Sequence, residues 1–195
     1  FLGTDFRSVA TENRVVANGL LGLGYQMDGN QLRWTNLYVH DTLKRTSLAG
    51  GTNSQNPGRE LRRQDTAWYE RELMSTQLAG TLELDPVRID ARASTSQSRR
   101  DAPYELGIGY SRSNDAGSPY GAYFINGLDN GATGYATVAF SKLKEDLSSA
   151  GVDVSWRMAP GVVLSGGYDY AYTARDSSRR EFQILNPGTA DWANS

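Results

Sequence analysis

The side chains best suited to chemistry are scattered along this sequence and form no catalytic motif. His40 is the only histidine, and no nucleophile-elbow motif accompanies it, so a Ser-His-Asp triad is not expected; we expect His40 to face a pore or an interface. The lack of cysteine excludes disulfides and thiolate metal sites, and no calcium-loop spacing occurs. The glycines of GLLGLG, residues 19–24, lie in strand-like alternation with no helix after them, which argues against a phosphate loop. We therefore expect no enzyme activity, cofactor or metal site.

Charged side chains recur at every second position in two parts of the chain. Successive side chains of a strand point to opposite faces, so such runs predict charges on one face of a sheet. The residues concerned are Arg88, Asp90, Arg92, Asp153, Arg157, Asp169 and Arg175. They would either contact a domain inside a pore and guide a solute, or pair with one another as solvated wall charges, which is the interpretation we favour.

Aromatic residues are concentrated in residues 100–138, which also contain Pro103, Pro119 and many glycines. A coil of this length is uncommon in compact domains and usually functional where it occurs. Stacking of a ligand on these rings is one interpretation, and a loop that extends strands above a membrane is the other. The candidate substrate-binding residues in this loop are Tyr104, Tyr110, Tyr120, Tyr123 and Phe124.

The element that organises these residues is the stretch from Ser149 to Arg175. Apolar and polar side chains alternate on both sides of a short turn at Ala159-Pro160-Gly161, and this period of two indicates a β-hairpin with one apolar face. Each arm has about ten alternating residues, the length that a tilted strand needs to cross a bilayer. Strands of soluble domains are usually nearer five or six residues.

The same unit occurs three times. We predict an all-β, antiparallel, up-and-down transmembrane β-barrel, of which the chain holds an incomplete segment of about six long strands. The hairpins are expected at residues 13–44, 66–99 and 139–176, and long extracellular loops at 45–65, 100–138 and 177–195. Short turns thus fall at one end and long loops at the other, as in outer-membrane barrels. Aromatic girdles are expected at both ends, with Trp68, Tyr170 and Tyr172 in the one near the loops.

Bulk composition is compatible with this prediction. The chain has 195 residues, of which 38% are hydrophobic, and carries a net charge of −2. No apolar run reaches the roughly 18 residues of a transmembrane helix, but barrel strands place apolar residues only at alternate positions. The weak net charge argues against nucleic acid as a partner.

Several stretches resemble one family in this order along the chain. ENRVVANGLLGLGYQ, QLRWTNLYVHDT, AWYERELMSTQLAGTLEL, APYELGIGYSRSN, SPYGAYFINGLDN and LKEDLSSAGVDVSWRMAPGVVLSGGYDYAYT are similar to the barrel region of TonB-dependent outer-membrane receptors, above all the alphaproteobacterial type. The similarity extends from Thr11 to Phe182. It implies a plugged barrel of about 22 strands that imports a scarce nutrient, such as a ferric siderophore, with energy from the TonB complex.

The chain departs from that family in what it contains. It shows no plug domain and no energy-coupling box, and Trp192-Ala193-Asn194-Ser195 is not a terminal aromatic strand. Because the smallest bacterial barrels have about eight strands, we expect a fragment whose partners are outer-membrane lipid, its own missing plug, the TonB complex and a nutrient ligand that the sequence does not identify.

Two other classes of protein remain open. A small non-transporting barrel or adhesin would end on a closing aromatic strand. A soluble β-sandwich binding module also alternates polar and apolar faces, but has shorter strands and no one-sided difference between turns and loops.

Overall fold

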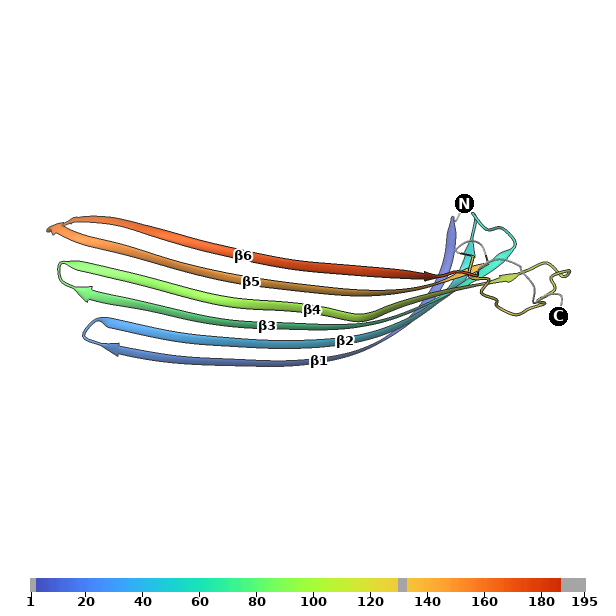
Figure 1. Ribbon diagram of the computed structural model, residues 1–195, viewed down its shortest axis with the longest axis horizontal. Coiled ribbons are helices and arrows are strands. Elements are labelled where there is room, and N and C mark those ends of the chain that lie inside the picture. Colours follow the sequence, from blue (N-terminus) through green and yellow to red (C-terminus); the bar gives the residue numbers. More distant parts are fainter. Residues whose placement is uncertain (1–2, 130–132, 187–195) are drawn as a thin grey trace.

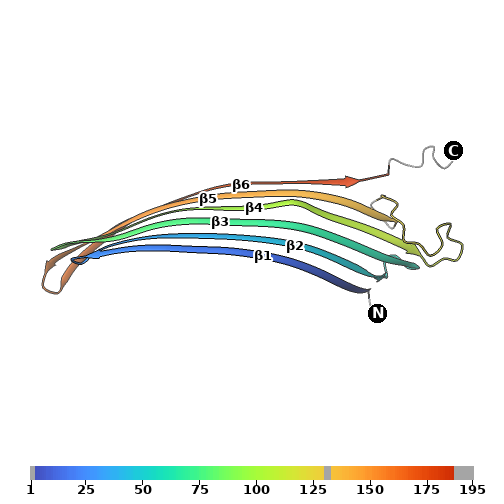
Figure 2. The same cartoon turned by 90° about the horizontal axis from the view of Figure 1, so that it is seen from below.

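The computed structural model describes residues 3–129 and 133–186, and these residues form one antiparallel sheet. Figure 1 shows its six strands side by side in chain order, and Figure 2 shows the curvature of the sheet along their length. The strands are β1 Thr4–Met27, β2 Asn30–Asn53, β3 Arg59–Leu84, β4 Val87–Ser113, β5 Gly134–Ala159 and β6 Val162–Ile184. The prediction of an all-β, up-and-down arrangement of six long strands is confirmed. No described helix is long and apolar enough to cross a membrane.

Short turns join the strands of each predicted hairpin at the left end of Figure 1. Asp28 and Gly29 have φ angles of 51° and 81°, as a tight hairpin turn requires, and Asp and Gly are the residues that adopt them most readily. Gly161 has a φ of 81° after Pro160. Asp85 and Pro86 form the third turn. The turn after Ala159 lies where the sequence predicts it, and the other two turns lie within the hairpins predicted at residues 13–44 and 66–99.

The strands extend far beyond the predicted hairpins, with 23 to 27 residues each. The prediction of irregular loops is therefore wrong for residues 45–53, 59–65, 100–113, 134–138 and 177–184, which are strand. Residues 54–58 form a short connection, and residues 114–129 and 133 belong to a longer one. Residues 130–132 and 187–195 lie outside the described residues. These segments are strand because the hydrogen bonds between neighbouring strands join main-chain groups, whatever the side chains are. Residues 45–53 and 59–65 have no apolar face, so they lack the alternation that reveals a strand. Residues 104–111 do alternate, with Tyr104, Leu106, Ile108 and Tyr110 on one face, but a bulge separates them from the alternation nearer the turns.

One bulge on β4 changes the pairing in the half of the sheet that is farther from the short turns. Ala102 and Pro103 lie opposite the single residue Tyr69 of β3, and Pro103 and Tyr104 lie opposite the single residue Phe140 of β5. Such a bulge inserts one extra residue into a strand. On β4 the residues that share a face are therefore odd-numbered as far as Asp101 and even-numbered from Tyr104.

Almost nothing in the sheet is buried. The buried hydrophobic residues among those described are Ala102, Ala136 and Ala139, whereas Leu20 and Tyr168 are 74% and 68% exposed. A single sheet layer has no second layer to cover it, so the usual hydrophobic core is missing from the described residues. What covers the exposed apolar side chains is the central question about this fold.

Candidate functional site

The strand register divides the sheet into an apolar face and a polar face. Across all six strands, one cross-strand row consists of Tyr25, Leu32, Gly80, Ala91, Val152 and Tyr168. The next row, on the opposite face, consists of Gly24, Arg33, Ala79, Arg92, Gly151 and Asp169. The two faces thus differ in character residue by residue, as the sequence predicts.

The apolar face carries a continuous apolar band next to the short turns. Its large exposed members are Leu21, Leu23, Tyr25, Met27, Leu32, Trp34, Tyr38, Met74, Leu78, Leu82, Leu84, Val152, Val154, Trp156, Leu164, Tyr168, Tyr170 and Tyr172. On each strand the band covers about ten residues, or roughly 34 Å along the strand. At a tilt of about 40° this gives a height of roughly 26 Å, which matches the apolar band of membrane barrels.

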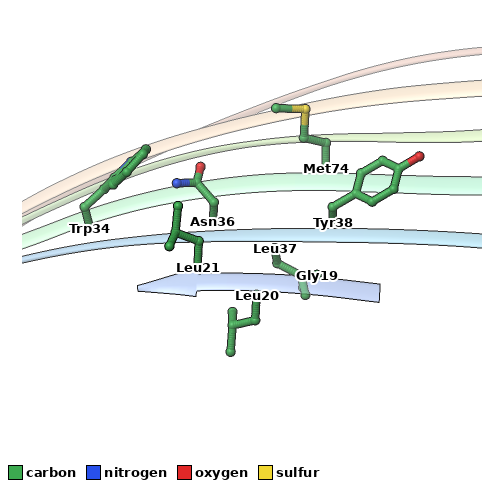
Figure 3. A pocket seen from close by; sticks show the side chains of 8 residues that line it. All are labelled: Gly19, Leu20, Leu21, Trp34, Asn36, Leu37, Tyr38 and Met74. Carbon is green, nitrogen blue, oxygen red and sulfur yellow. The ribbon is translucent and has the colours of Figure 1, made fainter. Parts of the chain in front are cut away.

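A shallow hollow of about 460 Å³ interrupts this band over β1, β2 and β3 (Figure 3). Trp34, Tyr38 and Met74 stand around it, and Asn36 lies between them. The Asn36 side-chain carbonyl accepts a hydrogen bond of 2.6 Å from Thr76, but its buried amide nitrogen has no partner among the described residues. Asn36 is therefore an incompletely paired polar group on an otherwise apolar surface.

The apolar side chains end at a belt of charges on the same face. This charged belt consists of Glu70, Glu72, Arg99, Asp101, Lys142, Lys144, Asp146 and Asp176. His40 lies at its edge, 3.1 Å from Thr42 and 4.0 Å from Glu72. The charged belt marks the end of the apolar band that is farther from the short turns.

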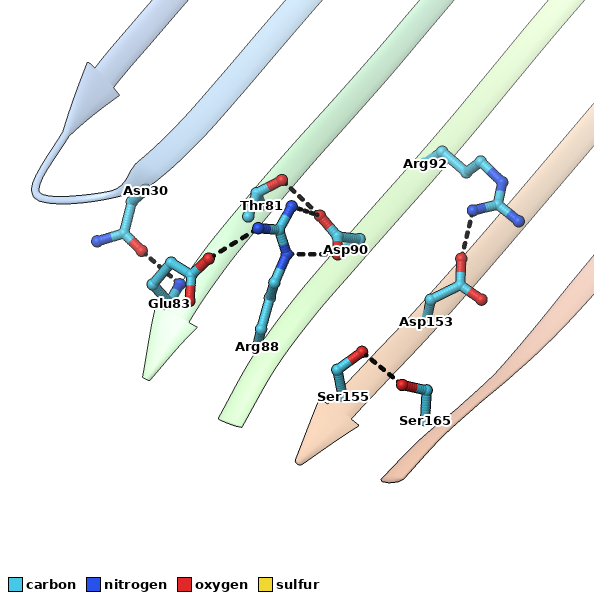
Figure 4. A network of polar contacts seen from close by, with 9 residues as sticks. All are labelled: Asn30, Thr81, Glu83, Arg88, Asp90, Arg92, Asp153, Ser155 and Ser165. Atoms are coloured by element: carbon cyan, nitrogen blue, oxygen red, sulfur yellow. Dashed lines mark hydrogen bonds and ion pairs between the residues drawn. The ribbon is translucent and has the colours of Figure 1, made fainter. Parts of the chain in front are cut away.

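The polar face brings the predicted charged residues together. Arg88 contacts Asp90 at 2.8 Å and Glu83 at 3.0 Å, and Thr81 donates to Asp90 at 2.6 Å (Figure 4). Arg92 lies 2.6 Å from Asp153. These contacts agree with the interpretation that the charges pair with one another.

The remaining predicted charges on this face also have partners. Arg92 contacts Asp169 at 2.5 Å as well, Arg157 lies 3.3 Å from Asp85, and Arg175 lies 3.2 Å from Glu145. Most of these side chains are about half exposed, so each pair contributes little to stability on its own. As a set they form a network of paired positive and negative side chains on the polar face.

Two glycines make room for this network. A Cβ added to Gly151 would meet Asp169 and Arg92, and one added to Gly167 would meet Asp153. Each glycine lies directly opposite the carboxylate concerned, since Gly151 pairs with Asp169 and Asp153 pairs with Gly167. The carboxylates therefore lie flat over a glycine beside Arg92.

A second polar cluster lies further from the turns on the polar face. Asp41 is only 6% exposed and accepts hydrogen bonds of 2.8 and 2.9 Å from Arg14 and of 3.3 Å from Arg71. The hydrogen bonds from Arg14 hold the pKa of Asp41 below its usual range. Tyr69 donates a hydrogen bond of 2.5 Å to Glu105, which raises the pKa of the Tyr69 hydroxyl.

This second cluster adjoins a hollow of about 360 Å³. Arg179 lies 2.6 Å from Glu105 at its edge, and Arg63 and Tyr135 also line it. Sequence reasoning missed the cluster because Tyr69 and Asp41 were not recognised as facing the same side as the charges near the turns. Continuation of the strand period through residues 41, 69 and 71 would have been the signal.

The predicted aromatic candidates do not converge on one site. Tyr104 lies on β4 against Trp68, with ring centroids 6.2 Å apart, and Tyr110 lies near the end of the same strand. Tyr120 and Tyr123 are exposed in the connection between β4 and β5. Phe124 lies between two guanidinium groups, 4.1 Å from that of Arg62 and 4.8 Å from that of Arg112.

The aromatic residues far from the short turns do not form the single girdle that the sequence predicts. Trp68 is 16 residues from Leu84 along β3, whereas Tyr172 is 10 residues from Val162 along β6. The charged belt lies between these two levels, so Trp68 does not belong to the same ring as Tyr170 and Tyr172. No group of three His, Asp or Glu side chains that could hold a metal ion occurs in residues 3–129 and 133–186.

No protein-family model and no curated protein matches the chain. Among solved structures, the translocator domain of autotransporter NalP from Neisseria meningitidis shares 9% identity over 86% of each chain, with a TM-score of 0.15. A structure described as a pore-forming protein shares 6% identity over 85% of this chain and 96% of that chain, with a TM-score of 0.14. A variant of the Rh. blastica porin shares 8% over 89% and 100%, with a TM-score of 0.12. Likenesses this weak carry no argument.

Proposed function

We propose that this chain forms part of the wall of an outer-membrane β-barrel, with the apolar face against lipid and the polar face toward a water-filled lumen. The observation that carries the proposal is the uncovered apolar band of about ten residues per strand, backed on the other face by paired charges. The spanning segments would be residues 17–27, 30–38, 74–84, 87–95, 148–159 and 162–172.

A soluble β-sandwich fits these features poorly. It would need a second sheet about 10 Å away to cover the apolar face, and the described residues form one sheet only. Soluble monomers rarely expose a contiguous apolar surface of this size. Hydrocarbon covers it without any further protein layer.

We propose further that the barrel is an energy-coupled importer of the TonB-dependent type, which takes up a scarce nutrient such as a ferric chelate. An apolar patch on the otherwise polar face supports an occupant in the lumen. It contains Leu20 and Leu37, which pair across β1 and β2, together with Val39 and Leu73. A plug domain that packs on this patch would remove it from water.

Site-directed spin labelling tests the orientation of the wall. Labels at Val154 and Leu164 should be reached by a quencher dissolved in lipid, whereas labels at Asp153 and Ser165 should be reached by a water-soluble quencher. The opposite pattern would overturn the barrel proposal. Equal access of the water-soluble quencher to all four positions would also overturn it.

A transport assay tests the importer proposal separately. Cells that produce the protein should take up a radiolabelled ferric chelate, and an uncoupler of the inner-membrane proton gradient should abolish that uptake. A correctly oriented barrel whose chelate flux persists in the presence of the uncoupler would instead be a passive pore. A correctly oriented barrel without flux across a panel of chelates would be a non-transporting barrel or adhesin.

A further inference from the structure

We propose that Arg71 and Arg100 bind an anionic group of the transported solute, so that the importer takes up a chelate that carries carboxylate groups. This inference rests on the proposed function, because a solute reaches these side chains only if the polar face lines the lumen. Arg71 and Arg100 lie on the polar face, directly opposite each other on β3 and β4. Like charges in such a cross-strand pair repel each other, and an anion between them would remove that repulsion.

The nearest carboxylate does not neutralise this pair. Asp41 lies opposite Arg71 on β2, but Arg14 donates two hydrogen bonds to it, at 2.8 and 2.9 Å, and Arg71 donates one at 3.3 Å. Arg100 has no ion pair within residues 3–129 and 133–186, and its neighbour across to β5 is Leu143. The arginine cluster of Arg14, Arg71 and Arg100 therefore shares a single carboxylate.

The other carboxylates on this half of the polar face contact arginines outside the cluster. They are Glu12 with Arg45, Asp65 with Arg63, Glu145 with Arg175, and both Glu105 and Glu181 with Arg179. Because Arg179 serves two carboxylates, the surplus of positive charge in the described part of this half lies at the arginine cluster alone.

Tyr69 helps to hold the two guanidinium groups in place. Those of Arg71 and Arg100 lie 5.9 and 5.2 Å from the centroid of its ring, near enough for cation–π attraction. Arg71 uses only Nη1 on Asp41, so its other N–H groups and those of Arg100 can donate to a carboxylate in the two-bond arrangement that guanidinium groups favour. Asp41 itself is only 6% exposed, so an approaching anion meets the guanidinium groups rather than this carboxylate.

The hollow of about 360 Å³ beside Tyr69 leaves room for the rest of the solute. Its volume lies in the range of roughly 300–1,000 Å³ that is usual for small-molecule sites. Gly109 keeps space open for the Tyr135 ring that lines the hollow, because a Cβ at residue 109 would meet that ring. The ionised side chains of the hollow contact one another, so the anionic group is assigned to Arg71 and Arg100 and the uncharged part of the solute to the hollow.

Equilibrium dialysis with the detergent-solubilised protein tests the proposal. The probes are ferric citrate, which is an anion, and a neutral ferric trihydroxamate chelate. Ferric citrate should bind more tightly, and its affinity should fall as the salt concentration rises. Arg100→Gln should lower the affinity for ferric citrate roughly tenfold or more, because charge-assisted hydrogen bonds are lost, and Arg100→Lys should restore only part of it. Binding of the trihydroxamate chelate should not change in either variant.

Arg33→Gln is the matched control. Arg33 lies on the polar face near the short turns, between Gly24 and Ala79, and forms no ion pair with another described residue. The variant removes the same charge and should bind ferric citrate as the original protein does. Equal affinity for the two chelates, no binding of ferric citrate, or equal weakening by Arg33→Gln would overturn the inference. Normal spin-label orientation with unchanged ferric citrate binding in Arg100→Gln would refute this site alone, whereas reversed orientation would refute the barrel.

Discussion

Replacing Val154 with arginine should destabilise the protein in a lipid bilayer by about 2–4 kcal/mol, because a charge near the bilayer midplane of a barrel costs this much. The structure gives the depth. Val154 lies six residues before Pro160, roughly 20 Å along the strand and about 15 Å in height at a tilt of 40°. This is near the middle of a band about 26 Å high. Its neighbours across the strands, Ile89 and Gly166, offer no counter-charge.

The assay is denaturant unfolding of the protein from phospholipid vesicles, with Ser149→Arg as the control. Ser149 lies on the same strand but on the polar face, where it shares a hydrogen bond of 2.7 Å with Ser94, and its replacement should cost about 1 kcal/mol at most. Equal destabilisation by the two variants would refute the assignment of the faces. So would a loss of less than about 0.5 kcal/mol for Val154→Arg, given the cost of a charge at mid-depth.

Three further variants test other parts of the molecule. Gly151→Ala should displace Asp169 from Arg92 and lower stability by about 1–3 kcal/mol, and a crystal structure of the variant with this pair intact would contradict the expectation. Because the pKa of Asp41 lies below the usual 3.8, its stabilising effect is present above about pH 4 and is lost as the pH falls further; Asp41→Asn should therefore reduce the difference in unfolding free energy between pH 5 and pH 3. Asn36→Leu should stabilise the protein in vesicles by about 1 kcal/mol, since it removes an unpaired buried amide, and unfolding in vesicles measures this.

Sequence reasoning succeeds where one face of a strand is apolar. The alternation around Val154 and the turn at Asp28 and Gly29 predict the hairpins near the turns and the side that each charge faces. These features are local, because side-chain direction follows from a period of two and turn type from residues that tolerate positive φ.

The half of the sheet that is farther from the short turns could not be predicted in this way. Residues 45–53 carry polar side chains on both faces, so no period distinguishes strand from coil there. Residues 104–111 do alternate, with Tyr104, Leu106, Ile108 and Tyr110 on one face, but out of phase with the alternation of residues 87–93. The bulge between Ala102 and Glu105 reverses the parity of the sequence pattern. The period of two gives the side that Asp41, Arg14 and Tyr69 face, but their proximity depends on the pairing of strands that are distant in the sequence, which composition and spacing do not encode.

The outer edges of β1 and β6 carry backbone groups that need hydrogen-bond partners. Among the described residues these two strands do not pair with each other, so every second residue along each of them directs its peptide N–H and C=O groups sideways. Inside hydrocarbon each such group without an acceptor or donor costs several kcal/mol. In the proposed barrel, the surface beside each edge would therefore have to supply backbone donors and acceptors throughout the spanning depth, and the register of β1 and β6 would set how a further strand aligns with them.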